Sequence, residues 1–298
     1  MQEIKITEQI SGQRLDKFLA RHLGAAPKTF IHKMLRKKNI VVNGKRVEGS
    51  QILIVGDIVT LYLAEDTIAK FTKARTAHDG PLDIIFEDEN IIIVNKPANL
   101  LTQPASAHGD SLTSRLRHHY ADAAFAPVAI NRLDRNTTGI VLCAKNLTCA
   151  QILAKLVHDK KIEKNYLAVA HGEISHKILL EGLHTKDEAK NMAKIVPCGT
   201  IGREVVTKIT PIKYHAKKDA TVLRIGLETG RSHQIRAHLA SIGHPLIGDR
   251  KYGGYGEERQ MLHAREIVFG EAGGALKNFS GLGLEVPVPE DMKKYIDA

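Results

Sequence analysis

The spacing of hydrophobic and polar residues separates a short N-terminal module from a longer C-terminal region. Between residues 14 and 36, apolar residues recur every three or four positions in two runs, which predicts two amphipathic helices. Gly24 is suited to end the first helix. Pro27 is suited to begin the second, because the first turn of a helix needs no N–H donor from that residue.

A hairpin and one further strand are expected after the two helices. The apolar run at residues 40–47 is interrupted by Asn43-Gly44, the residue pair most typical of a two-residue hairpin turn. Residues 56–61 predict a final strand. Residues 1–63 are therefore predicted to form a small α+β domain.

The periodicity is lost between residues 64 and 80, which is typical of a linker. Residues 81–298 contain many strand-like runs with helical runs among them, but no regular β–α–β alternation. This pattern favours an α+β domain with a mixed, largely antiparallel sheet and flanking helices. The expected strands are residues 82–87, 91–97, 140–144, 164–169, 205–212 and 221–227, and the expected helices are residues 112–120, 146–157 and 233–242.

Charge indicates the kind of partner. The 298-residue chain has 43 Lys and Arg against 33 Asp and Glu, a net charge of +10. A basic surface is compatible with solubility alone, but it is also the electrostatic signature of a nucleic-acid-binding protein. Aromatic residues make up 5% of the chain and Trp is absent, so a stacking platform for single strands is disfavoured. Folded RNA, read through its shape and phosphates, fits better.

The sequence gives no sign of a membrane or secreted protein. The sequence has no run of eighteen apolar residues, so no membrane span is predicted. The N-terminus also lacks the apolar region of a signal peptide. Cys143, Cys149 and Cys198 match no paired spacing, as in proteins of the reducing cytosol. We expect a cytoplasmic monomer that does not bind membranes.

Cationic residues gather on the N-terminal module, at the end of its second helix and on the adjoining hairpin turn. A charge run is compatible with a merely solvated face. Its concentration on two neighbouring elements favours contact with RNA phosphates. The six residues are Lys33, Arg36, Lys37, Lys38, Lys45 and Arg46.

The most distinctive chemistry lies in residues 131–139, where Asp134 stands between Arg132 and Arg135. A Thr-Thr-Gly turn then leads into the apolar run of residues 140–143. Two cations so near to an aspartate in sequence favour its ionised form. Such an aspartate is either part of a structural ion pair or a nucleophile kept deprotonated, and the local sequence is compatible with both.

Three blocks together resemble one enzyme family. Residues 132–139 resemble the Arg-Leu-Asp-Arg-x-Thr-x-Gly motif of the RluA-type pseudouridine synthases, which isomerise uridine in structured RNA. Residues 164–169 resemble the family's Lys-x-Tyr-x-Ala strand, and residues 230–253 resemble its long C-terminal signature. The family commonly has His where Asn131 stands and Ser where Thr138 stands; both replacements keep a polar, hydrogen-bonding side chain.

The resemblance implies roles for particular residues. Asp134 is the carboxylate that attacks the ribose or the base, and Arg236 matches the arginine that pairs with it. Tyr166 matches the tyrosine that packs on the base and is placed to remove the C5 proton. Arg132 matches the residue that enters the RNA stack when the uridine flips out. Further RNA contacts are expected from Arg231, His233 and Gln234.

The resemblance also extends to the N-terminal module, which is similar to the small RNA-binding domain first seen in a ribosomal protein of the small subunit. It implies structured RNA as the partner, in particular large-subunit (23S) ribosomal RNA. No metal or nucleotide cofactor is expected, because the spacing of His233, His238 and His244 matches no zinc motif and no phosphate-loop sequence occurs.

Two other functions are compatible with parts of the sequence. One is a non-catalytic RNA-binding protein with a decayed site, against which the intact Asp134, Tyr166 and Arg236 argue. The other is a hydrolytic glycosidase or nucleoside hydrolase, which would need a second carboxylate that no motif offers.

Overall fold

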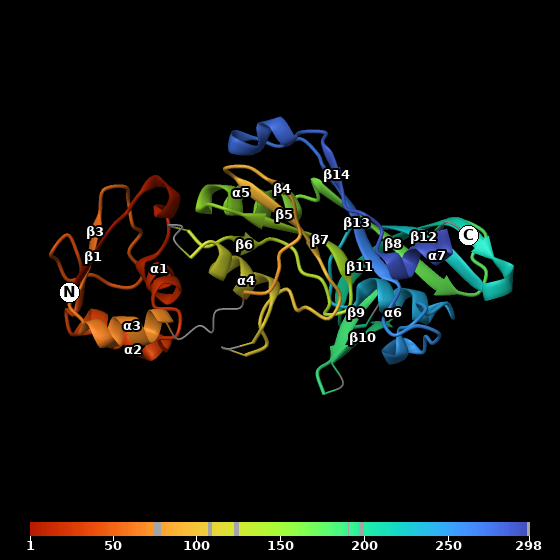
Figure 1. Cartoon of the computed structure of the whole chain (residues 1–298), viewed down its shortest axis with the longest axis horizontal. Helices are drawn as coiled ribbons and strands as arrows, with labels where there is room; N and C mark the ends of the chain where they lie inside the picture. Colours follow the sequence, from red (N-terminus) through yellow and green to blue (C-terminus); the bar gives the residue numbers. More distant parts are fainter. Residues whose placement is uncertain (74–78, 107–108, 122–124, 190, 197–199, 297–298) are drawn as a thin grey trace.

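The fold consists of a three-stranded sheet and an eleven-stranded sheet, each accompanied by helices (Figure 1). The computed structural model describes residues 1–73, 79–106, 109–121, 125–189, 191–196 and 200–296. The predicted fold class is confirmed: a mixed, largely antiparallel sheet with helices follows a small α+β domain. Cys198 lies outside the described residues, and Cys143 and Cys149 are buried free thiols.

The N-terminal domain packs two helices on its small sheet. Its main elements are β1 (Gln2–Lys5), α1 (Leu15–His22), α2 (Lys28–Arg36), β2 (Ile40–Val42) and β3 (Ile58–Leu61). The strands pair antiparallel in the order β1-β3-β2. The apolar faces predicted for both helices are confirmed as the core of this domain. Their buried side chains are Leu15, Phe18, Leu19, Ile31, Met34 and Leu35.

The Asn43-Gly44 turn forms as predicted, but the hairpin is shorter than predicted. Both turn residues have positive φ, 50° and 71°, as a type I′ turn requires. Val42 and Lys45 exchange two backbone hydrogen bonds of 3.1 and 2.9 Å, and the pairing then stops. Beyond the turn, the carbonyl oxygens of residues 49 and 51 accept hydrogen bonds from the first N–H groups of α1. Satisfying these helix-end donors takes the chain away from β2.

The sequence predicted an irregular linker from residue 64, but a helix, α3 (Glu65–Lys73), forms there instead. Ile68 and Phe71 are partly buried against the N-terminal core, and the Phe71 ring lies 4.7 Å from that of Phe30. Only two apolar side chains anchor this helix, too few to produce a clear sequence period. Residues 74–78 of the predicted linker lie outside the described residues, and the domain limits at 63 and 80 stay predictions.

The large sheet has an unbroken path of nine strands. Its strands are β4 (Ile84–Glu87), β5 (Ile91–Lys96), β6 (Val128–Ala129), β7 (Thr138–Ala144), β8 (Ile162–His171), β9 (Ile178–Asp187), β10 (Met192–Val196), β11 (Arg203–His215), β12 (Ala220–Leu227), β13 (Leu262–Phe269) and β14 (Gly283–Glu285). The path runs β10-β9-β11-β12-β8-β13-β7-β5-β4, with β14 beside β13 and β6 beside β7. Among the described strands, only β13 and β7 pair in parallel.

Helices cover both faces of this sheet. They are α4 (Leu112–His119), α5 (Leu147–His158), α6 (Gln234–Ser241) and α7 (Glu290–Ile296), with 3₁₀ turns at Ala216–Lys218, Arg250–Tyr252 and Gly274–Phe279. A further 3₁₀ turn, Glu8–Ile10, belongs to the N-terminal domain. Alternate residues of β5 enter different cores, as the two-residue period of a strand requires. Ile92 and Val94 share a core with α4 and α6, and Ile91 and Ile93 share one with α5. No helix in the described ranges is both long and apolar enough to cross a membrane.

The N-terminal domain contacts the large-sheet domain through a small apolar surface. Phe125 is buried in the N-terminal core, and Leu147, the first residue of α5, packs against it. The guanidinium of Arg21 lies 5.3 Å from the centre of the Phe125 ring, within reach of a cation–π interaction. The two domains are therefore in direct contact as well as joined through the chain.

The parallel junction of β7 and β13 requires a glycine. Gly139 has φ 110°, and a Cβ there would lie 2.2 Å from the backbone oxygen of Ala264. Ala264 is its partner in the register, next to the pair His263 and Thr138. Only a residue without a side chain lets the two strands approach this closely.

We predict that Gly139→Ala lowers the free energy of unfolding by about 3 kcal/mol or more, because the added Cβ meets backbone that cannot move aside. Gly273→Ala is the matched control. Gly273 has φ −118° and no atom within 4 Å of an added Cβ. That change should alter stability by less than about 1 kcal/mol. Urea denaturation of both variants measures the difference, and equal stabilities would contradict the close approach.

Candidate active site

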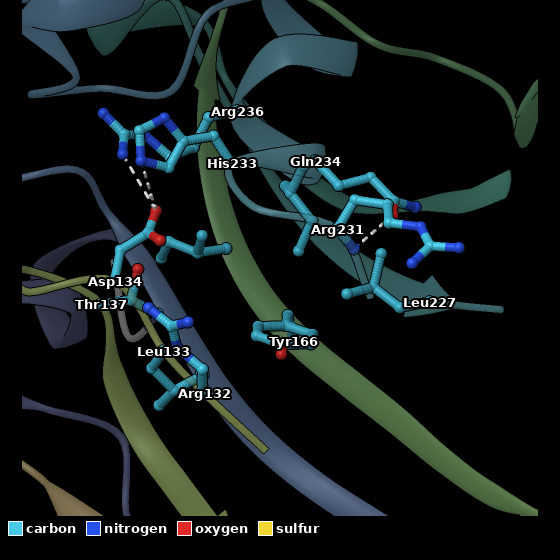
Figure 2. A pocket seen from close by; sticks show the side chains of 12 residues that line it. Arg132, Leu133, Asp134, Thr137, Tyr166, Leu227, Arg231, His233, Gln234 and Arg236 are labelled. Atoms are coloured by element: carbon cyan, nitrogen blue, oxygen red, sulfur yellow. Dashed lines mark hydrogen bonds and ion pairs between the residues drawn. The ribbon is translucent and has the colours of Figure 1, made fainter. Parts of the chain in front are cut away.

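A pocket opens beside the start of β7, and the third sequence block forms one of its walls (Figure 2). It contains about 350 Å³ of open space, the lower range of small-ligand sites. The loop before β7, strands β8, β12 and β13, and the start of α6 all contribute side chains. The lining residues are Arg132, Leu133, Asp134, Thr137, Tyr166, Leu227, Arg231, His233, Gln234, Ile235, Arg236 and Leu262.

Asp134 occupies a turn at the edge of this pocket. Its carbonyl oxygen accepts a hydrogen bond of 3.1 Å from the Thr137 N–H, which closes the turn. The side chain is 26% exposed, so a substrate can reach it. Its Oδ2 accepts a hydrogen bond of 2.9 Å from Arg236 Nη1 (Figure 2). No partner holds Oδ1 among the described residues, so this oxygen is free to act on a substrate.

Arg236 is fixed by a second carboxylate behind it. Its Nε and Nη2 donate to the two oxygens of Asp249 at 2.7 and 2.8 Å, and Asp249 is 2% exposed. The guanidinium also lies 4.9 Å from the centre of the Tyr252 ring. Burial lowers the pKa of Arg236, but the hydrogen bonds and charges of Asp249 and Asp134 raise it overall. A planar guanidinium gripped at two atoms leaves its third nitrogen aimed at Asp134.

His233 stands beside the same carboxylate. It precedes α6 with a positive φ of 56°, and its Nε2 lies 3.8 Å from Asp134 Oδ2. Its Nδ1 lies 3.0 Å from the Tyr252 hydroxyl, which also accepts a hydrogen bond from the Ala193 N–H. Burial lowers the pKa of His233, and Arg236 adds to this while Asp134 opposes it. The ring is therefore neutral at pH 7, and Arg236 supplies the positive charge at the site.

Lys96 supports the Asp134 loop from below. It is fully buried, and its Nζ donates to the carbonyl oxygens of Pro97, Leu100 and Arg135 at 2.8, 2.7 and 3.1 Å. Burial lowers its pKa to about 7, against the opposing charge of Asp134. Three acceptors match the three N–H donors of an ammonium group. The protonated form therefore connects the loop that follows β5 to the loop that carries Asp134.

Tyr166 forms part of the pocket wall from β8. The residue is 8% exposed and packs within the core shared by α4 and α6. Burial raises the pKa of Tyr166, and the charge of Asp134 raises it further. The hydroxyl therefore stays protonated at neutral pH, and the ring offers a flat apolar surface to a bound base.

The structure brings together all seven residues that the sequence assigned to the catalytic region. Asp134, Tyr166, Arg236, Arg132, Arg231, His233 and Gln234 line the same pocket. Arg132 and Arg231 are exposed, as contact with RNA requires. Gln234 is different, because it is 2% exposed.

All four hydrogen-bonding positions of the Gln234 amide are used inside the protein. Its oxygen accepts from Thr229 Oγ1 and the Arg231 N–H, and its nitrogen donates to Val206 O and Thr207 Oγ1. No hydrogen-bonding atom is left over for RNA. Gln234 therefore supports the loop before α6.

The arginines that flank Asp134 in sequence do not hold it in the structure. The sequence interpretation relied on Arg132 and Arg135, but both side chains are exposed, and neither forms an ion pair with Asp134 among the described residues. The turn at Asp134 points its neighbours outward. The ion pair comes instead from Arg236, 102 positions away in sequence, as the family resemblance implied.

Several supporting residues were missed in the sequence. Asp249 and Tyr252 lie inside the third motif block, which was the available signal for them. Lys96 lies in the predicted strand at residues 91–97. Asn131 secures the start of β7, because its amide donates to Ile140 O and accepts from the Leu142 N–H at 3.0 and 2.8 Å. Thr138 Oγ1 lies 2.9 Å from His263 Nδ1.

The six cations of the N-terminal domain are all exposed. They lie on the end of α2, just after it, and around the Asn43-Gly44 turn. No ion pair engages any of them in the part of the chain that the structure describes. Their charges are therefore available to phosphates. The six are Lys33, Arg36, Lys37, Lys38, Lys45 and Arg46.

Comparison with known proteins supports both parts of this description. The RNA pseudouridylate synthase family matches residues 90–241, and the S4 domain matches residues 13–59. The chain is 31% identical to the uncharacterized RNA pseudouridine synthase YlyB of Bacillus subtilis (strain 168), over 100% of this chain and 98% of that protein. It is also 31% identical to the ribosomal large subunit pseudouridine synthase D of Escherichia coli (strain K12), over 99% and 94%.

A solved structure has the same fold. Human RNA Pseudouridylate Synthase Domain Containing 1 matches 73% of this chain and 87% of its own, with a TM-score of 0.57 and 20% identity. The family match and the full-length relatives define an enzyme that modifies RNA. The chain belongs to the RluA-type family of RNA pseudouridine synthases, and it carries an N-terminal S4 RNA-binding domain.

We predict that Asp249→Asn lowers both stability and activity, since the buried end of Arg236 loses its counter-charge. The free energy of unfolding should fall by about 3 kcal/mol or more. The rate of pseudouridine formation should fall at least about tenfold as Arg236 shifts away from Asp134. Urea denaturation and initial rates measure the two effects.

Glu285→Gln is the control for this prediction. Glu285 is the 54% exposed partner of Arg265 at 2.8 Å. Losing this surface pair should cost less than about 1 kcal/mol and leave the rate unchanged. Wild-type activity in the Asp249 variant would show that Arg236 needs no support from behind.

Proposed function

We propose that the protein converts uridines of large-subunit (23S) ribosomal RNA into pseudouridine, with Asp134 as the catalytic carboxylate. The substrate class is supported by the Escherichia coli relative, which is named for the ribosomal large subunit and aligns with nearly the whole chain. The observation that carries the catalytic assignment is the pocket-edge carboxylate with one oxygen paired to Arg236 and the other free.

The reaction breaks the N1–C1′ bond of uridine, turns the base and joins it to C1′ through C5. A carboxylate beside the ribose can attack C1′, or attack the base at C6, and so hold the separated fragments. Arg236 orients Asp134 from the protein side, so the free Oδ1 faces the substrate. The protonated Arg236 also balances the charge of the carboxylate before the attack.

Tyr166 supplies one face of the base-binding space. Its ring, with Leu133 and Leu227, forms the apolar part of the pocket wall. Because its pKa is raised, the hydroxyl is a poor base at neutral pH. We assign it the packing of the base and the relay of the C5 proton to water. N1 gains a proton from the solvent in exchange, so the overall change is an isomerisation.

Base flipping is assigned to Arg132. The pocket lies between Asp134 and Tyr166, so a uridine stacked in an RNA helix must turn out of its stack to enter it. Arg132 is exposed next to Asp134 at the pocket and carries a planar guanidinium that can fill the vacated space. Arg231 and His233 lie on the other side of the pocket, where they can contact the flipped nucleotide.

A hydrolytic reaction is less compatible with this geometry. Glycoside hydrolysis uses two carboxylates that both reach the substrate. Asp249 is the second carboxylate here, but it is buried behind Arg236, which holds both of its oxygens.

We also propose a cytoplasmic monomer. The pocket is lined by residues of a single chain. The two named relatives come from bacteria, where ribosomal RNA is made in the cytoplasm.

We predict that Asp134→Asn reduces pseudouridine formation to below about 1% of the wild-type rate, because the isosteric amide cannot attack as an anion. RNA affinity and stability should be nearly unchanged. Asp159→Asn makes the same chemical change on an exposed residue at the end of α5 and should have full activity. Release of the C5 hydrogen from labelled RNA measures the rate.

Mapping pseudouridines in ribosomal and transfer RNA, from cells with and without the protein, tests the substrate. The modification should disappear from specific large-subunit positions only. Residual turnover of more than a few per cent in Asp134→Asn would remove Asp134 from its role. Changes confined to transfer RNA would leave the chemistry intact and overturn the ribosomal assignment.

We predict that the N-terminal cations contribute affinity and not chemistry. Replacing Lys33, Lys37 and Lys45 together by Ala should reduce the slope of log affinity against log salt by about two to three units, since each phosphate contact releases a counterion. The rate at saturating RNA should stay within about twofold of wild type, because these contacts only position the RNA.

The control removes the same charge elsewhere. Lys155, Lys208 and Lys294 already pair with Asp159, Glu228 and Glu257. Replacing these three by Ala should leave the salt slope close to that of the wild type. If both triple variants lose the same slope, net charge matters and the N-terminal domain is not a specific anchor.

A further inference from the structure

Lys164 belongs to the second sequence block, but the mechanism above gives it no role. It precedes Tyr166 by two residues on β8, and residues two apart on a strand face the same side of the sheet. Directly opposite Lys164 on β12 lies Leu227, which lines the pocket. Cross-strand partners also share a face, so both relations place Lys164 on the pocket side.

The ammonium group of Lys164 reaches the rim of the pocket. Its Nζ lies 3.6 Å from the position that a Cβ on Gly230 would occupy. Gly230 is exposed and begins the loop that carries Arg231 and His233 to the pocket. The absence of a side chain at this position leaves the space above the Nζ open.

Lys164 is half-buried yet has no counter-charge. Within the described part of the chain, no carboxylate or carbonyl oxygen pairs with its Nζ, and burial alone lowers its pKa. Two neighbouring lysines behave differently, since Lys160 and Lys208 both pair with Glu228, at 3.8 and 2.7 Å. A partly desolvated cation without a partner costs folding free energy, which points to an anionic ligand as the missing partner.

We propose that the Nζ of Lys164 binds a phosphate oxygen of the RNA backbone next to the target uridine, with Arg231 as the second cation on this rim. The inference rests on the proposal that the reaction occurs at Asp134. A phosphate fits better than a base, because the apolar wall formed by Tyr166 and Leu227 already accommodates the base. The flipped nucleotide must then bring its phosphates to the rim, where Lys164 lies.

The first test compares three variants of the full chain on a short ribosomal RNA fragment that contains a mapped target uridine. Lys164→Met should raise KM about tenfold, the usual effect of losing a hydrogen bond to a charged group, with kcat within about twofold. Lys164→Arg keeps the charge and should recover most of the affinity. Lys208→Met, which removes a lysine already paired with Glu228, should behave as wild type.

The stability of Lys164→Met provides a second test. Removing an unpaired, half-buried charge should leave the urea midpoint unchanged or raise it. A structural lysine would show the opposite, a lower midpoint together with a loss of kcat. Either a lowered midpoint or an unchanged KM in Lys164→Met would overturn the proposal.

The decisive test replaces the phosphates around the target uridine, one at a time, by neutral methylphosphonates. One of these substitutions should raise KM for the wild type about as much as Lys164→Met does. The same substitution should have little further effect on Lys164→Met, since interacting partners are not additive. Strictly additive effects at every position would show that Lys164 contacts the base or nothing.

The outcomes separate this inference from the proposed function. If Asp134→Asn remains active, the proposed function fails whatever Lys164 does. If Asp134→Asn is inactive and the methylphosphonate effects are additive, the catalytic assignment stands and only the phosphate contact is rejected.

Discussion

The active site depends on the position of one buried guanidinium. Arg236 is gripped by Asp249 from behind, lies against Tyr252 and presents its remaining nitrogen to Asp134. Burying a charge is costly unless it is paired, so Arg236, Asp249 and Asp134 stabilise one another's positions. The conformation of the Asp134 carboxylate is thus a consequence of how α6, the loop at 249–253 and the turn before β7 pack together.

Hydrophobic periodicity and the family resemblance predicted much of the fold, because in these elements the local sequence pattern agrees with the packing in the whole structure. The helices α1, α2 and α5 have clear apolar faces, and Asn146 caps α5 by accepting a hydrogen bond of 2.8 Å from the Cys149 N–H. The strands β9, β10 and β13 were not predicted. β9 alternates between half-buried and exposed residues and includes Gly182 and His184, so neither face is consistently apolar. Its pairing is set by neighbours distant in sequence.

The site was predictable to the extent that its residues fall inside recognisable blocks. Asp134, Tyr166 and Arg236 could be named, and the resemblance implied the ion pair between Arg236 and Asp134. The support that Asp249 gives to Arg236 from behind was not predicted. Local reasoning assigned the ion pair to Arg132 and Arg135, because it could not foresee which way the turn directs side chains. Likewise, Gln234 is a polar residue of the kind that contacts RNA, and its supporting role is visible only from the four hydrogen bonds that its amide makes inside the protein. Sequence proximity is a weak guide to charge pairing when a turn intervenes.

The parallel junction of β7 and β13 has a mechanical consequence. In the described residues its backbone ladder has two residue pairs, Thr138 with His263 and Gly139 with Ala264, and the apolar core continues across it. Asp134 is attached to the β7 side of the junction, while Tyr166 and Arg236 are attached to the β13 side. The residues proposed to carry the reaction therefore lie on opposite sides of this junction. The relative position of Asp134 and Tyr166 therefore depends on how closely β7 packs against β13, which in turn requires the glycine at position 139.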